Sequence, residues 1–242
     1  MRQLNSLFIL FTISLLAACD APEKTAASVI DATIEAHGGA AYDSLEVEFT
    51  FRKKAYLIDL EKGNYRYERY WTDSIGEIRD VLTNNGFKRF IDSQPIALSK
   101  KDSSIYANAL NSVQYFALLP YGLQQEAVIP TLLEEQVFEE DKYYVVQVRF
   151  TEENGGEDFE DVFCYWVNQE SMLVDYLAYQ YHTNGGGARF REAFNRVEKE
   201  GVVFQDYKNY KAPLDTSIAS YLTLFKKDEL ALLSTISLEL ND

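Results

Sequence analysis

Four side chains of the types that most often carry catalysis or bind metals stand out first: Cys19, Cys164, His37 and His182. A thiol beside an imidazole can act as a nucleophile and base, and several such groups at short spacing can hold a metal ion. The two histidines lie far apart in the sequence, which excludes HExxH-type metal motifs, and no GxSxG nucleophile motif is present. We therefore predict no catalytic residue, no metal site and no cofactor.

Three of these residues, His37, His182 and Cys164, are each explained by a structural role. His37 is predicted to end a helix, where a protonated imidazole suits the negative end of the helix dipole. His182 is predicted to flank a turn. Cys164 alternates with Val162 and Trp166 in an apolar strand and is predicted to be a buried structural thiol.

An acidic hairpin offers a different chemistry, because carboxylates are the ligands that hard cations such as Ca²⁺ prefer. Its acidic residues flank Gly155 and Gly156, and they are Glu152, Glu153, Glu157, Asp158, Glu160 and Asp161. The spacing does not match the calcium-loop pattern, so a solvated turn is the prediction and a calcium site the alternative. A metal-dependent hydrolase that uses these carboxylates is a further alternative function.

The segment Asn184-Gly185-Gly186-Gly187, a glycine run after an asparagine, could in principle cradle a phosphate, as glycine-rich loops do between a strand and a helix. Both flanks of this run have the composition of strands. A hairpin turn is therefore predicted.

Aromatic and arginine side chains alternate along two predicted strands. Tyr65 and Tyr67 share one face with Arg69 and Trp71, and Arg189 shares a face with Arg191. Aromatic rings beside arginine can bind sugar rings or acidic headgroups. Cross-strand packing with salt bridges is the commoner use of such faces and is predicted here.

The N-terminus carries the targeting information. A short basic start precedes an apolar stretch at residues 7–18, which is too short to span a bilayer permanently. Two alanines then precede Cys19. This order resembles a bacterial lipoprotein signal, and the resemblance implies cleavage after residue 18 and acylation of Cys19. Residues 19–24 would then form a lipidated tether to a cell-envelope membrane, leaving residues 25–242 as a single β-rich domain.

Composition restricts the partners. The formal net charge is −15, and an acidic domain is repelled by nucleic acid and by anionic lipid surfaces. We therefore expect no nucleic-acid partner, and membrane contact through the lipid on Cys19. Because Cys19 is committed to the lipid, Cys164 has no disulfide partner.

Hydrophobic periodicity predicts a mainly β protein with helices. Residues 25–37 have one apolar face and precede Gly38-Gly39, which indicates a helix with a C-terminal stop. Period-two strands follow over residues 46–91, with Asn84-Asn85-Gly86 as a hairpin turn. A helix is predicted over residues 104–118, capped by Asp102 or Ser103 and ended by Pro120.

Strands resume in the second half. Residues 124–133 are ambiguous because Pro130 should interrupt a regular element. Further strands are predicted over residues 143–150, 162–167, 173–181, 188–197 and 202–210, and the alternation over residues 232–240 predicts a last one. The fold class is thus α+β: a curved antiparallel sheet, or half-barrel, with an N-terminal helix and a mid-chain helical insertion.

This order of elements resembles the LolA/LolB type of periplasmic lipoprotein carrier. The features that carry the resemblance are the helix ending in His37-Gly38-Gly39, the following strand with Phe49, the helix over residues 104–118 and the late hairpins. The segment from Tyr176 through the glycine run also resembles a family of uncharacterised bacterial envelope lipoproteins. The carrier resemblance implies a sheet that wraps a hydrophobic cavity, with helices covering its open side.

Together these observations predict a lipid-anchored envelope protein that binds an apolar or amphipathic ligand, such as a lipid, without catalysis. The predicted ligand-binding residues are Phe49, Phe51, Tyr65, Tyr67, Val146, Val148, Phe163 and Tyr165. The alternative is a structural or interaction lipoprotein that binds envelope proteins or glycans through its acidic, tyrosine-rich surface.

Overall fold

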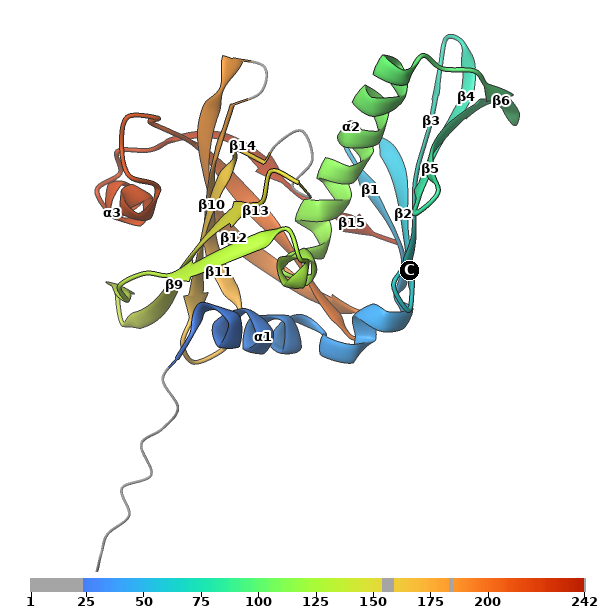
Figure 1. Cartoon of the computed structure of the whole chain (residues 1–242). Coiled ribbons are helices and arrows are strands. Elements are labelled where there is room, and N and C mark those ends of the chain that lie inside the picture. Colours follow the sequence, from blue (N-terminus) through green and yellow to red (C-terminus); the bar gives the residue numbers. More distant parts are fainter. Residues whose placement is uncertain (1–23, 154–158, 183–184, 242) are drawn as a thin grey trace, which may run out of the picture.

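A computed structural model describes residues 24–153, 159–182 and 185–241. The signal, Cys19 and most of the tether predicted from the sequence lie outside these residues, as do Glu157, Asp158 and Asn184. Within the described part, the chain forms two antiparallel sheets with helices around them (Figure 1). The predicted α+β class with open, curved antiparallel sheets is therefore confirmed.

Seven strands of the described chain form the first sheet. In spatial order they are β15 (Glu239–Leu240), β1 (Glu46–Phe51), β2 (Lys54–Glu61), β3 (Asn64–Asp73), β4 (Gly76–Thr83), β5 (Gly86–Ile91) and β6 (Gln94–Ile96). The predicted hairpin turn is present between β4 and β5, where Thr83 pairs with Gly86. Gly86 has a φ of 105°, a conformation that favours glycine.

The second sheet follows α2 in the sequence. Its strands in spatial order, among the residues described, are β14 (Ala231–Ile236), β13 (Val202–Ala212), β12 (Gly187–Lys199), β11 (Val174–Tyr181), β10 (Val162–Asn168), β9 (Asp141–Phe150) and β7 (Val128–Leu132), with β8 (Gln136–Phe138) paired to β9. The expectation that Pro130 interrupts this region is wrong. β7 lies at the sheet edge, where a residue without a backbone N–H is tolerated.

The helices occupy three places. α1 (Ala26–His37) runs along one end of the sheets, followed by the 3₁₀ turn η1 (Gly39–Ser44). α2 (Lys100–Leu118) lies between the two sheets and leads into η2 (Tyr121–Gln124), whereas η5 (Ile218–Ser220) and α3 (Tyr221–Lys226) cover the other face of the second sheet (Figure 1).

Two predicted boundaries need correction. α2 begins at Lys100 and is capped by Ser99, whose hydroxyl accepts the Asp102 N–H at 3.1 Å, so neither Asp102 nor Ser103 is the cap. The alternating residues 232–240 do not form one strand. The chain leaves the second sheet after Ile236, and β15 pairs instead with β1 of the first sheet.

Two hydrophobic clusters result. The inner cluster lies between the two sheets and α2, and the outer cluster lies between the second sheet and α3. β10 supplies both: Tyr165 and its alternate neighbours face the inner cluster, and Cys164 and Trp166 face the outer one. This explains why the sequence of β10 is apolar on both faces.

Candidate functional site

A cavity of about 190 Å³ opens beside the inner cluster, between α2 and the facing strands. It is lined by Phe51 and Arg52 at the end of β1, by Ser112, Val113, Phe116 and Ala117 of α2, by Arg191 of β12, by Gln205 and Tyr207 of β13, and by Ile236 and Leu238 of the C-terminal segment. The crossing of that segment from the second sheet to the first thus completes the wall.

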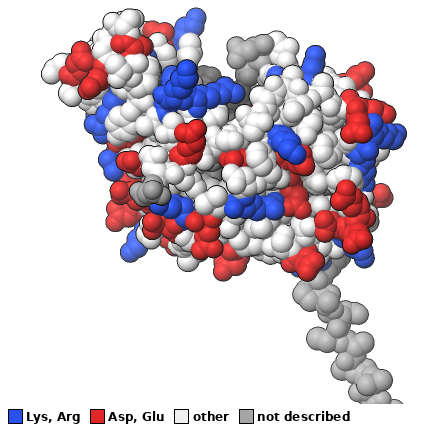
Figure 2. Space-filling view, turned by 180° about the vertical axis from the view of Figure 1, so that it is seen from behind, with Lys and Arg blue, Asp and Glu red and all other residues white. Residues whose placement is uncertain are grey.

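Most of the lining is apolar, and its charged members have one sign. Arg52 and Arg191 line the cavity, and none of the carboxylates that the structure describes does. Figure 2, by contrast, shows acidic and basic side chains scattered over one outer face of the molecule. The cavity therefore combines apolar walls with positive charge, although the whole chain is acidic.

Arg191 is unusual among the residues that line the cavity, because it is a charged side chain that is only 6% exposed. Its Nη2 donates to the Tyr179 hydroxyl at 3.0 Å, and its guanidinium lies 3.9 Å from the ring centroid of Phe116. The Nε atom is buried and has no hydrogen-bond partner in the described structure. A guanidinium stacked between rings is stabilised by cation–π attraction, but its edge is left with an unused donor.

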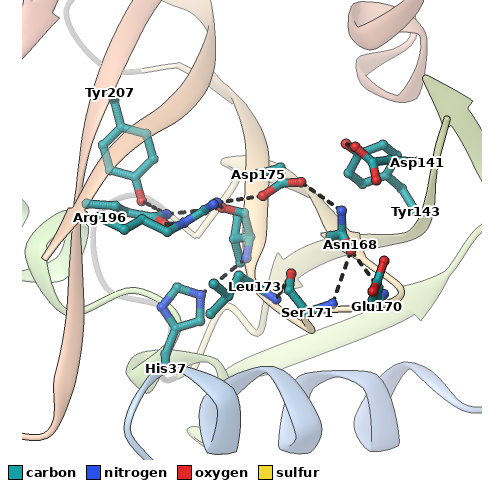
Figure 3. A network of polar contacts seen from close by, with 12 residues as sticks. His37, Asp141, Tyr143, Asn168, Glu170, Ser171, Leu173, Asp175, Arg196 and Tyr207 are labelled. Carbon is teal, nitrogen blue, oxygen red and sulfur yellow. Dashed lines mark hydrogen bonds and ion pairs between the residues drawn. The ribbon is translucent and has the colours of Figure 1, made fainter. Parts of the chain in front are cut away.

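A polar network behind the cavity fixes the wall formed by β13 (Figure 3). Gln205 donates from Nε2 to the Tyr207 hydroxyl at 2.7 Å and to the carbonyl of Val174 at 3.2 Å. Its Oε1 accepts from Arg196, which also pairs with Asp175 at 2.5 Å. Burial raises the pKa of Tyr207, so its hydroxyl is neutral.

His37 joins the same network from the end of α1. Its Nε2 accepts the backbone N–H of Val174 at 3.2 Å, and the side chain is fully buried. Burial, together with a smaller effect of the nearby Arg196 charge, lowers the pKa of His37 to about 4. His37 does end the helix as predicted. The expected protonated imidazole is wrong, because an ion at this position would lose its hydration.

The structure places all the sequence-predicted ligand-binding residues in or against the inner cluster. Phe51 lines the cavity itself. Tyr65 and Tyr67 stack on each other at 4.8 Å, and Phe163 packs against Phe116 at 6.5 Å between centroids. Phe49, Val146, Val148 and Tyr165 are buried between the sheets. As ligand contacts, these residues stay predictions.

Sequence reasoning missed the residues that distinguish the cavity. It paired Arg191 with Arg189 on one face but did not reveal that this face points inward. The sequence alone held no signal for this, because only the cross-strand register of the structure places Arg191 opposite Leu177, a residue of the inner cluster. The contributions of Ile236 and Leu238 could not be found, because they depend on the chain crossing between sheets.

Comparison with known proteins decides the family. The model of a family of unknown function (DUF6503) matches residues 5–238. The chain belongs to this family. A search of curated proteins found no significant match.

Two solved structures are similar to this family member. A LolA superfamily protein from Nitrosomonas europaea superimposes with a TM-score of 0.52 at 16% identity, covering 91% of this chain and 93% of that one. A DUF1329 family protein from Desulfovibrio piger gives a TM-score of 0.44 at 8% identity, covering 81% and 96%. At 16% identity the first similarity establishes a LolA-like fold and nothing about activity.

The aromatic–arginine face of β3 in this family member is a packed ion cluster. Asp80 is fully buried between Arg69 and Arg89, whose nitrogens lie 2.5 and 2.6 Å from its oxygens. The ammonium of Lys54 lies 4.0 Å from the ring centroid of Trp71. On this face, the predicted combination of packing with salt bridges is confirmed.

The remaining reactive groups are dispersed. Cys164 is fully buried, as predicted, and burial raises the pKa of its thiol. His182 follows β11 and lies 3.6 Å from Asp161. Among the residues described, no group of three or more His, Cys, Asp or Glu side chains could hold a metal ion. No helix in the same residues is long and apolar enough to cross a membrane.

Proposed function

We propose that this protein is a lipid-anchored envelope protein that binds an apolar or amphipathic ligand in the cavity between its two sheets, without catalysis. The observation that carries the proposal is the cavity of about 190 Å³ with its mostly apolar wall. The LolA-like fold supports it, because a protein of the LolA superfamily has the same arrangement of elements. Acyl chains on Cys19 would attach the protein to the membrane, because their burial in the bilayer anchors it stably.

The cavity's size limits what it can hold. A cavity of roughly 150 Å³ lined by apolar side chains accommodates a benzene-sized molecule, whereas pockets for larger ligands usually exceed about 300 Å³. The cavity as observed therefore suits a short acyl segment or one ring. A longer chain would have to displace α2, which buries Leu110, Gln114, Ala117 and Leu118 against the sheets.

Mass spectrometry tests the proposal directly. Residues 19–242 carrying C19S would be directed to the periplasm of a bacterial host, purified without detergent and measured intact under native conditions. Extra mass that solvent extraction releases as lipid is the expected result. A clean apo mass, together with no binding of the small neutral probe hexanol in titration calorimetry, would refute the proposal.

A pair of tryptophan variants on α2 localises the binding. Val113→Trp fills the cavity and is expected to abolish probe uptake. Ile105→Trp adds the same side chain at a position of α2 that is 51% exposed, and uptake should be unchanged. Equal uptake by both folded variants would place the ligand elsewhere.

One observation favours the alternative of an interaction protein. β14 lies at the edge of the second sheet, and its Leu232 and Leu233 are 57% and 49% exposed. An exposed apolar edge strand can pair with another chain. Recovery of a stoichiometric envelope protein or glycan with the wild-type protein, lost on Leu232→Lys, would support this alternative.

A further inference from the structure

We propose that the cavity ligand carries an anionic group, a carboxylate or a phosphate, and that Arg191 binds it. This inference rests on the proposed function and specifies its ligand class. The charges of the lining give the first argument. Arg52 and Arg191 line the cavity without a carboxylate among the described residues, in a chain whose formal net charge is −15. Such a lining attracts an anion and disfavours a cation.

The second argument compares Arg191 with the other shielded arginines of the described chain. Arg69 and Arg89 both pair with Asp80, and Arg196 pairs with Asp175. Arg191 is as deeply buried as Arg69, yet within the described residues no carboxylate comes within 4.0 Å of it. A buried charge without a counter-ion is unfavourable. An anion on the ligand would supply the missing partner.

The third argument is the geometry of the donor. Tyr179 holds Nη2 and the Phe116 ring covers the guanidinium face, so the side chain is fixed in position. The buried Nε remains without an acceptor and belongs to a residue that lines the cavity. A preformed guanidinium loses little conformational freedom when it binds a carboxylate or phosphate oxygen.

The rest of the lining indicates that the anion is part of an amphiphile. Val113, Phe116, Ile236 and Leu238 offer apolar surface near Arg191. A free inorganic anion would leave that surface uncovered, whereas an attached hydrocarbon chain would bury it. The arrangement fits a ligand with one charged end and one apolar end.

Titration calorimetry on residues 19–242 carrying C19S tests this with three probes: decanoate, decanol and inorganic phosphate. We expect wild-type protein to bind decanoate about tenfold or more tightly than decanol, as a charged hydrogen bond provides. Phosphate should bind far more weakly than decanoate. Equal affinity for decanoate and decanol would overturn the inference and leave the proposed function standing. Phosphate binding as tight as decanoate would also overturn it.

Two variants assign the effect to one residue. Arg191→Met removes the guanidinium but keeps an unbranched stem, and it is expected to lose the preference for decanoate, with decanol affinity within about twofold of wild type. Arg189→Met is the matched control, since Arg189 lies two residues away on β12 and does not line the cavity. Retention of the preference by folded Arg191→Met would refute the assignment. Binding of neither decanoate nor decanol by wild type would refute the proposed function itself, and the inference with it.

Discussion

Asp80 has two arginine partners and no access to solvent, so both arginines are needed to compensate its buried negative charge. Removing one member of a buried ion group leaves the others uncompensated, which costs about 3 kcal/mol or more. Asp80→Asn is therefore expected to lower the free energy of unfolding by about 3 kcal/mol. The measurement is urea denaturation followed by circular dichroism.

The control for this variant is Asp59→Asn. Asp59 also pairs with an arginine, Arg66, but the two side chains are 28% and 44% exposed. Exposed pairs contribute about 0.5 kcal/mol, so a small loss is expected. Equal losses in the two variants would contradict the importance assigned to burial.

His37 makes the stability depend on pH. Its pKa is about 4 in the folded protein, against 6.5 for an ordinary histidine, because burial disfavours the protonated imidazole. Between these values the unfolded chain binds a proton that the folded chain does not. Stability is thus complete above pH 6.5 and is expected to fall by about 3 kcal/mol as the pH is lowered to 4.

Urea denaturation of wild type and His37→Gln at pH 7, 5.5 and 4.5 measures this contribution. Glutamine keeps an acceptor for the Val174 N–H and has no proton to gain in this range. The variant should lack the His37 part of the slope, while the carboxylates contribute equally to both proteins. Parallel pH profiles would show instead that the pKa of His37 is the same in the folded and unfolded chains.

Among the elements, α2 shows why a helix start is hard to locate from sequence. Ser99, Asp102 and Ser103 are all good capping residues, and each precedes an apolar stripe. Which of them is the cap depends on the backbone conformation, because a cap residue is not itself helical. The backbone is extended at Ser99, which is therefore the cap. Ser99→Ala should cost about 1 kcal/mol in the free energy of unfolding, because the Asp102 N–H loses its acceptor.

Ser103→Ala is the corresponding control. Ser103 lies inside the first turn of α2, and alanine favours a helix interior over serine. Its expected effect is within about 0.5 kcal/mol of wild type. A larger loss for Ser103→Ala than for Ser99→Ala would restore Ser103 as the cap, one of the two residues that the sequence predicted.

The other elements differ in how far local sequence determines them. The apolar face of α1, with Val29, Ile30 and Ile34, was predictable because it repeats at helical spacing and is buried as expected. Most of the long strands were predictable from period-two alternation, whereas β6, β7 and β8 were not. The break after Ile236 was not, because the same alternation continues on both sides and tertiary packing moves β15 to the other sheet.

For the whole molecule, the α+β class and the order of the long elements followed from periodicity, whereas α3 and the division into two sheets did not. The inner cluster was partly foreseeable, since all the predicted ligand-binding residues lie in or against it. The charge of the cavity was not, because the sequence shows an acidic chain and gives no sign that Arg191 is turned inward. A site of this kind becomes visible only when strand register and burial are known.

The proposed attachment of the whole molecule to a membrane can be tested by labelling. The chain has two cysteines, so Cys164 serves as the control for Cys19. Wild-type protein expressed in cells supplied with alkyne-labelled palmitate should become labelled on Cys19 by acyl chains, which then hold the domain at the membrane. Cys19→Ser should lose the label completely. Cys164→Ser should keep it, because Cys164 is fully buried and burial raises the pKa of its thiol. Label that persists in Cys19→Ser, or that is missing from wild type, would remove the lipid anchor from the proposed function and leave the cavity unaffected.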